Sequence, residues 1–139
     1  MTQQRREGIL DTSALIDLGT LDPTTLPTEP RITAITLAEL SVGPLVPRTN
    51  AERAARQAHL QQAEADFEPI PFDSMAARAF GSVASSLRAS GRKPRARAYD
   101  ALIAATAISR GLPVYTSNQA DFEGIDGLTV HTVRRATEP

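Results

Sequence analysis

The sequence predicts an α/β fold built on a largely parallel sheet. Short apolar runs alternate with amphipathic segments along the chain, which is the pattern of consecutive βα units. The chain has 139 residues, 41% of them hydrophobic, which is enough for one sizeable core. No internal repeat, heptad seam or linker is visible in the sequence. We therefore expect a single domain over residues 1–139.

The first half of the chain is predicted to alternate short strands with short helices. Residues 8–10 form a strand and residues 13–18 a helix, whereas three prolines mark residues 21–30 as a loop. A second strand is expected over residues 31–34. Residues 36–42 are predicted to form a helix, which ends at the following Gly-Pro pair.

The second half is predicted to contain longer helices. Residues 50–67 are rich in alanine, arginine and glutamine, with Asn50 as the expected N-cap. Asp73 caps an amphipathic helix that ends at Gly91. Between these helices, two prolines allow residues 68–72 only as a short edge strand. The remaining predicted elements are a helix over 97–110 and strands over 114–115 and 129–133.

Composition and motifs argue against several classes of protein. Apolar runs fall short of the roughly 20 residues that cross a bilayer, and no signal-peptide pattern is present, so we expect a soluble cytoplasmic protein. Cysteine is absent, which removes disulfides and thiolate sites. No Walker A loop, dinucleotide fingerprint or serine elbow occurs. The only histidines, His59 and His131, have no neighbouring residues that complete a transition-metal site.

Charge is balanced overall but uneven along the chain. Fifteen basic and 16 acidic residues nearly cancel, so the molecule as a whole is no obvious polyanion binder. The stretch between Leu87 and Asp100 is purely cationic, and arginine suits bidentate phosphate contact. It is equally explained as a solvated helix end and loop. Its basic residues are Arg88, Arg92, Lys93, Arg95 and Arg97.

Four acidic residues stand where burial or clustering is suggested, and each also has a purely structural explanation. Asp11 ends the first strand and could simply cap the next helix. Glu39 lies on an apolar stripe, but Thr36 and Glu39 match a capping box, which the local sequence favours. Asp100 shares a stripe with aliphatic residues, although an acid in a first helical turn ordinarily complements the macrodipole. Asp121 follows polar turn residues, where an Asx-turn or a helix cap accounts for it.

The four acids are more informative as a set. The carboxyl ends of parallel strands meet at one crevice, where ligands bind. Asp11 and Asp121 each follow a strand, while Glu39 and Asp100 lie near the starts of helices that could border that crevice. Carboxylates gathered there raise one another's pKa values unless a cation lies among them. A hard divalent cation such as Mg²⁺ meets that need and supports in-line attack of water on a phosphodiester.

Four segments carry a resemblance that covers nearly the whole chain. They are ILDTSALIDL from residue 9, ITLAEL from residue 35, RARAYDALIAATAI from residue 95 and YTSNQADF from residue 115. Each alone is weak, but all four in this order resemble the PIN domain, and more narrowly the VapC-type ribonuclease toxins of bacterial type II toxin/antitoxin systems. The resemblance implies a three-layer α/β/α sandwich with a central parallel sheet. It also implies a metal-dependent endoribonuclease, a homodimer, and a cognate antitoxin that inserts a segment near the site.

The resemblance further implies roles for individual residues. The acids that would hold Mg²⁺ or Mn²⁺ and perform catalysis are Asp11, Glu39, Asp100 and Asp121. The resemblance therefore favours Glu39 as a buried metal ligand over Glu39 as a capping-box residue. The supporting polar positions are Thr12, Ser13, Thr116 and Asn118. The residues that would hold the RNA backbone, with an affinity that falls with salt, are Arg92, Lys93, Arg95 and Arg97.

Two rival functions have less support. A PIN-like module that binds RNA or protein without catalysis would show a damaged acidic set, and here it is intact. A phosphotransfer enzyme could use Asp11 as its nucleophile. Haloacid-dehalogenase-like enzymes, however, place a second aspartate where this chain has Ser13, and receiver domains need a lysine after a late strand, whereas Lys93 lies in the basic stretch. We therefore expect an endoribonuclease that leaves 5′ phosphates and 3′ hydroxyls.

Overall fold

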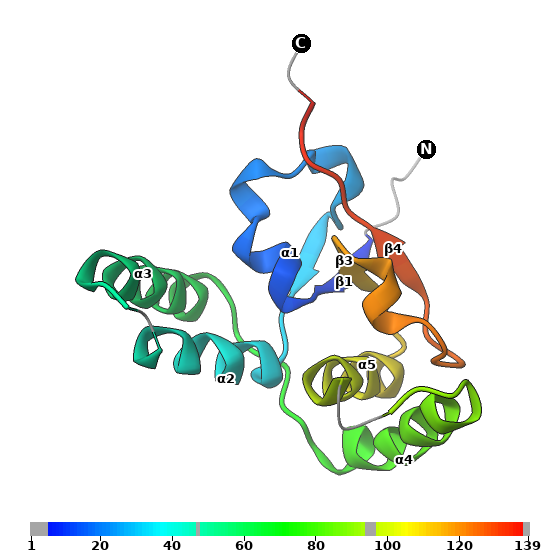
Figure 1. Cartoon of the computed structure of the whole chain (residues 1–139). Helices are drawn as coiled ribbons and strands as arrows, with labels where there is room; N and C mark the ends of the chain where they lie inside the picture. The colour runs from blue at the N-terminus through cyan, green and yellow to red at the C-terminus, as the bar shows by residue number, and fades with distance from the viewer. Residues whose placement is uncertain (1–5, 47, 94–96, 138–139) are drawn as a thin grey trace.

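The computed structural model describes residues 6–46, 48–93 and 97–137. Within these ranges four parallel strands form one sheet in the order β2-β1-β3-β4 (Figure 1). The strands are β1 (Glu7–Leu10), β2 (Glu29–Arg31), β3 (Val114–Thr116) and β4 (Val130–Thr132). Since β1 and β3 are central neighbours, the residues that follow them meet at the middle of one sheet edge.

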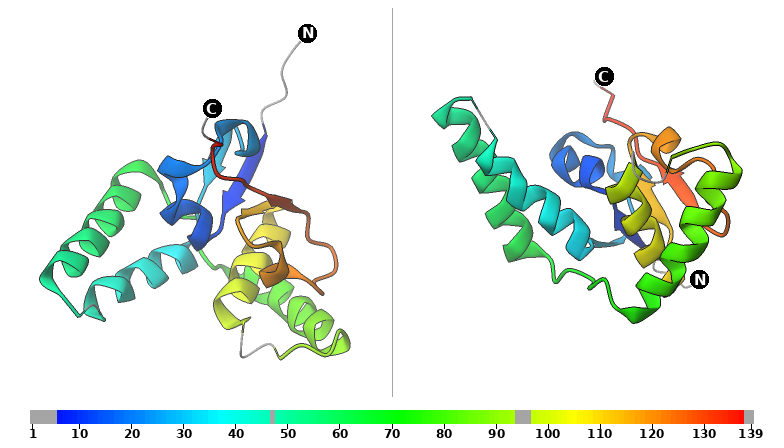
Figure 2. Two further views of the ribbon diagram at one scale, coloured as in Figure 1. Left: turned by 45° about the horizontal axis from the view of Figure 1, so that its top comes forward. Right: turned by 60° about the horizontal axis from the view of Figure 1, so that its bottom comes forward.

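Helices cover both faces of this sheet. The described α-helices are α1 (Thr12–Ile16), α2 (Ala34–Val42), α3 (Asn50–Asp66), α4 (Ser74–Ala89) and α5 (Ala98–Arg110). The short 3-10 turns are η1 (Leu18–Thr20), η2 (Pro23–Thr25), η3 (Gly43–Leu45) and η5 (Gln119–Phe122). The α2 and α3 helices form a hairpin on one side, and α4 packs along α5 on the other (Figure 2). None of the helices in the described ranges is long and apolar enough to span a bilayer.

The sheet separates two apolar cores. Ile9 and Val114 pack into a core that includes buried residues of α4 and α5. The next residues along the same strands, Leu10 and Tyr115, pack into a second core with residues of α1, α2 and α3. This alternation follows from the two-residue period of a strand, which sends successive side chains to opposite faces. The predicted three-layer α/β/α sandwich with a central parallel sheet is therefore confirmed.

Several predicted boundaries are wrong, each for a local reason. The second strand is residues 29–31 and not 31–34, because Thr33 becomes the N-cap of α2 and accepts from the Thr36 N–H at 3.2 Å. The predicted edge strand over 68–72 is reduced to one bridge between Thr33 and Ile70, since the flanking prolines lack donors. Thr49 and not Asn50 caps α3.

Candidate active site

Asp11 lies directly after β1 and is only 2% exposed. Its carboxylate accepts hydrogen bonds from the Ala14 N–H at 2.9 Å, the Ser13 hydroxyl at 2.9 Å and the Thr116 hydroxyl at 2.6 Å. The Ala14 bond makes Asp11 the N-cap of α1, so that structural role is real, and the Thr116 bond ties it to β3. Burial raises the pKa of Asp11, and the Thr116 hydrogen bond is the strongest effect opposing that rise.

Glu39 projects from α2 to Thr12, which directly follows Asp11. The Thr12 hydroxyl donates to Glu39 Oε1 at 2.6 Å and lies 3.0 Å from the Thr36 hydroxyl. Thr36 lies inside α2, whose N-cap is Thr33, so the capping-box interpretation is wrong. Burial raises the pKa of Glu39, the Thr12 hydrogen bond lowers it, and the nearby charge of Asp11 raises it further.

Asp121 lies in η5, which follows β3. Its Oδ1 accepts from the side-chain amide of Asn118 at 3.1 Å and is 3.7 Å from Arg97 Nη1. Asn118 donates its N–H to the Thr116 hydroxyl at 3.0 Å, and Thr116 donates in turn to Asp11. The predicted polar residues Thr116 and Asn118 therefore connect the first acid to the fourth.

Asp100 occupies the first turn of α5 and is partly buried. Among the described residues, none donates a hydrogen bond to its carboxylate or pairs with it within ion-pair distance. Burial raises the pKa of Asp100 to about 7, assisted by the charges of Asp121, Asp11 and Glu39 and opposed by Arg97. Since each of the other three acids acts on Asp100, the structure brings the whole predicted set into one acidic site.

The donors of this site fit a hydrated hard cation. All are carboxylate oxygens, they repel one another, and Asp100 has no hydrogen-bond or ion-pair partner among the described residues. In the part of the chain that the structure describes, no three acids or histidines gather closely enough to hold an ion by themselves. Mg²⁺ does not require that, because it usually keeps several waters and binds through one or two carboxylates plus substrate phosphate.

Two further hydroxyls belong to the site and were not predicted. Ser117 lies 2.9 Å from the Ser13 hydroxyl, which joins the segments after β1 and β3 a second time. The register of two neighbouring parallel strands could have identified it, since Ser117 follows β3 as Asp11 follows β1. Thr36 approaches Thr12 only because α2 packs beside α1, and no local pattern marks that contact.

The predicted RNA-binding residues differ in their surroundings. Arg92 pairs with Glu123 at 2.6 Å, and Arg97 donates to the Ala120 carbonyl at 2.9 Å. Lys93 is exposed, and Arg95 lies outside the described residues. The two described arginines of this set therefore already have partners within the protein.

Several known proteins are similar to this chain. The PIN domain family model matches residues 9–128. Ribonuclease VapC5 of Mycobacterium tuberculosis is 43% identical over 123 residues, which cover 86% of this chain and 88% of the relative. Ribonuclease VapC4 of the same organism is 31% identical over 102 residues, covering 73% and 75%.

Solved structures show the same fold. VapBC-5 from M. tuberculosis, a member of the VapBC family of toxin-antitoxin systems, matches with a TM-score of 0.79 and 39% identity over 91% of this chain and 98% of that chain. DNA-bound VapBC from Salmonella typhimurium matches with a TM-score of 0.67 and 26% identity over 93% and 98%. The family model spans most of the sequence, and the relatives cover most of both chains. This protein therefore belongs to the PIN domain family and, within it, to the VapC type.

Proposed function

We propose that this protein is a metal-dependent endoribonuclease and the toxin of a toxin/antitoxin pair. The observation that carries the proposal is the gathering of four carboxylates from separate segments, where the charges of Asp121, Asp11 and Glu39 each raise the pKa of Asp100 and no described residue pairs with it. Such a cluster is unfavourable without a cation and suits phosphodiester hydrolysis with one. The ribonuclease names of the two curated relatives and the toxin-antitoxin description of the matched complex support the same activity.

Asp11, Glu39, Asp100 and Asp121 are the residues that would hold Mg²⁺ or Mn²⁺, directly or through the waters that the ion retains. When bound, the ion supplies Lewis acidity for in-line attack of water on phosphorus and positive charge for the departing 3′ oxygen. The chain itself orients Asp11 and Glu39 and favours their ionised forms through hydroxyl donors. The donors of this kind are Thr12, Ser13 and Thr116, and Asn118 contributes an amide.

RNA would approach from the side of the basic stretch. Lys93 is exposed and free to contact phosphate, which would supply affinity without base selection. Phosphate contact remains a prediction for the other residues of that set, Arg92, Arg95 and Arg97, and it is least favoured for Arg97, whose guanidinium already contacts the Ala120 carbonyl and Asp121. The products would carry a 5′ phosphate and a 3′ hydroxyl, because water attacks and the 3′ oxygen departs.

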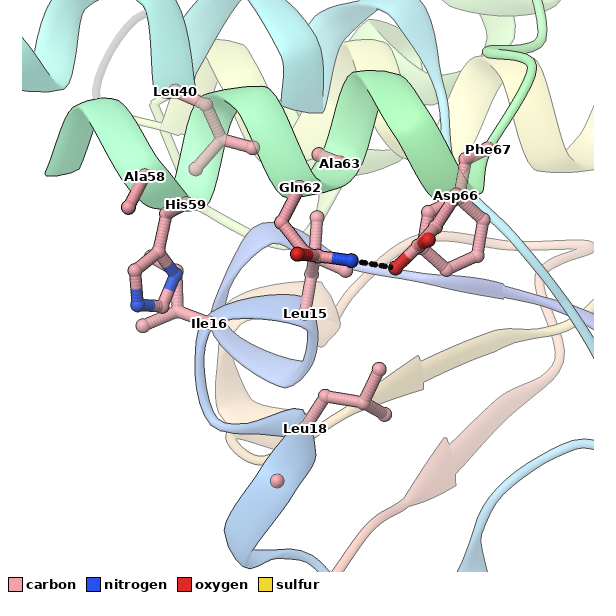
Figure 3. Close-up of a pocket in the computed structure, with 11 residues that line it drawn as sticks. Leu15, Ile16, Leu18, Leu40, Ala58, His59, Gln62, Ala63, Asp66 and Phe67 are labelled. Carbon is pink, nitrogen blue, oxygen red and sulfur yellow. Dashed lines mark hydrogen bonds between the residues drawn. The ribbon is translucent and has the colours of Figure 1, made fainter. Parts of the chain in front are cut away.

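A groove beside the site suits the antitoxin. It lies between α1 and α3, with an apolar floor and a polar rim that includes His59 and the hydrogen-bonded pair Gln62 and Asp66 (Figure 3). A neighbouring hollow shares Ile16, Leu40 and His59 with it and reaches Thr12 and Glu39. An amphipathic antitoxin segment could cover the floor while a basic side chain pairs with the carboxylates and excludes the metal. We also propose that the toxin forms a homodimer and that it acts in the cytoplasm.

The decisive experiment is cleavage of total cellular RNA by purified, antitoxin-free protein in Mg²⁺, Mn²⁺ or EDTA. Discrete metal-dependent cuts with 5′ phosphates are expected for the wild type and for the control Asp126→Asn, which alters an exposed acid outside the site. Asp11→Asn should abolish the cuts while keeping the fold. Cutting that persists in EDTA would contradict the metal proposal. A folded wild type that binds RNA but cuts in neither metal would instead be the non-catalytic PIN-like module.

A further inference from the structure

Arg97 is built into the protein beside the acidic site. It directly precedes α5, and its side chain is only 28% exposed. Its Nη1 donates to the Ala120 carbonyl at 2.9 Å and lies 3.7 Å from Asp121 Oδ1. One guanidinium therefore contacts both the backbone and the acid of η5. A side chain held at two points is a poor candidate for an additional phosphate contact.

The contacts of Arg97 continue into the site. Asp121 Oδ1, which faces Arg97, also accepts from Asn118, and the Asn118 N–H donates to Thr116. Thr116 in turn donates to Asp11. Arg97 thus stands at one end of a series of hydrogen bonds and one ion pair that fixes the fourth acid relative to the first.

The opposite end of η5 is held by a second arginine of the same basic stretch. Arg92 Nη2 donates to Glu123 Oε2 at 2.6 Å, and the Arg92 N–H donates to the Leu87 carbonyl at 2.8 Å. Close packing adds to this hold, since a Cβ at Gly124 would lie 2.5 Å from Ser90 Oγ. The segment that carries Asp121 is therefore anchored on both sides, by α4 through Arg92 and by the start of α5 through Arg97.

We propose that Arg97 is a positioning residue for Asp121 rather than a contact for RNA. This inference rests on the proposed nuclease function, because Asp121 is a ligand and catalytic acid only there. Arg97 keeps η5 at the edge of the sheet and holds the Asp121 carboxylate near Asp11 and Asp100. Displacement of a reacting group by about 1 Å can cost roughly 100-fold in rate, so loss of this anchor affects turnover. RNA affinity, by contrast, depends on exposed cations such as Lys93.

The test compares Arg97→Met with Lys93→Met, two substitutions that each remove one positive charge and keep an unbranched stem. For Arg97→Met we expect kcat to fall at least tenfold with KM within about twofold of wild type, a loss confined to the transition state. RNA binding measured in EDTA should keep its affinity and salt dependence. The opposite pattern is expected for Lys93→Met. Its RNA binding should be weaker, and the slope of log affinity against log salt concentration should be smaller by about one.

A third readout is independent of catalysis. The Asp121 N–H donates to the Asn118 carbonyl at 3.1 Å, so its hydrogen exchange should accelerate in Arg97→Met and stay unchanged in Lys93→Met. Arg97→Lys, which retains the charge but cannot reach both partners of η5, should give an intermediate kcat. Weaker RNA binding with a reduced salt slope and an unchanged kcat for Arg97→Met would overturn the proposal. If the wild type cuts no RNA, the nuclease assignment fails, and unchanged exchange at Asp121 would refute the anchor separately.

Discussion

Replacing Asp100 by asparagine should stabilise the metal-free protein above neutral pH. The pKa of Asp100 lies at about 7 instead of 3.8, and such a difference costs the folded state ~4 kcal/mol once the carboxyl is ionised. Because Asp100 is only partly buried, solvent screening reduces this to about 1–2 kcal/mol. For a domain of this size, that corresponds to a rise in Tm of roughly 3–8 °C.

The sign of the pH dependence follows from proton uptake. Between pH 3.8 and about 7, the folded state binds more protons at Asp100 than the unfolded state does. The stability that Asp100 contributes in its protonated form is therefore complete below pH 3.8 and is lost as the pH rises through about 7. Asparagine resembles the protonated carboxyl at every pH. The difference in Tm between the variant and the wild type should therefore be smaller at pH 5, where roughly a third of the stability has been lost, and largest at pH 8.

Thermal unfolding in EDTA at pH 5 and pH 8 measures this difference directly. Asp126→Asn is the matched control, because it removes one negative charge from an exposed loop position and should leave the pH dependence as it is. Addition of Mn²⁺ at pH 8 should raise the Tm of the wild type toward that of Asp100→Asn, since a ligand that binds only the folded state stabilises it. If the Tm of the wild type and the Tm of Asp100→Asn fall by the same amount between pH 5 and pH 8, the electrostatic coupling of the four acids is refuted.

Two further substitutions test contacts that position the site. Thr12→Val removes the hydroxyl that donates to Glu39 at 2.6 Å, so the pKa of Glu39 should rise. The acidic limb of the pH-rate profile should then move to higher pH, and an unshifted limb would contradict this. Gly8→Ala places a Cβ 2.3 Å from the Tyr115 ring and should destabilise the protein by about 1–3 kcal/mol in urea unfolding. Gly19→Ala, with no atom within 4 Å of its Cβ, is the control, and equal losses in both variants would be inconsistent with overpacking at Gly8.

The sequence by itself determined the fold class, and its resemblance to the PIN domain singled out the four acids as the predicted site. Alternating apolar runs and amphipathic segments predict a parallel α/β sheet without knowledge of any contact, because burial and the periods of strand and helix decide them locally. Asp11 and Asp121 also follow strands of that sheet, which is why the sequence predicts that they lie near one another. Strand ends were predicted less accurately, since residues such as Thr33 can either pair with a neighbouring strand or cap a helix.

The tertiary structure decided which local explanation holds for each acid. Glu39 accepts a hydrogen bond from Thr12, 27 residues earlier in the chain, and is not a capping-box residue. Asp11 is the N-cap of α1 and also accepts from Thr116, which lies 105 residues later. Arg97 belongs to a basic stretch in the sequence, yet it is bonded to the Ala120 carbonyl across 23 residues. Such contacts depend on how the elements pack, and no periodicity or spacing encodes them. The acidic quartet is therefore visible in the sequence, whereas its coupling and its anchors exist only in the folded chain.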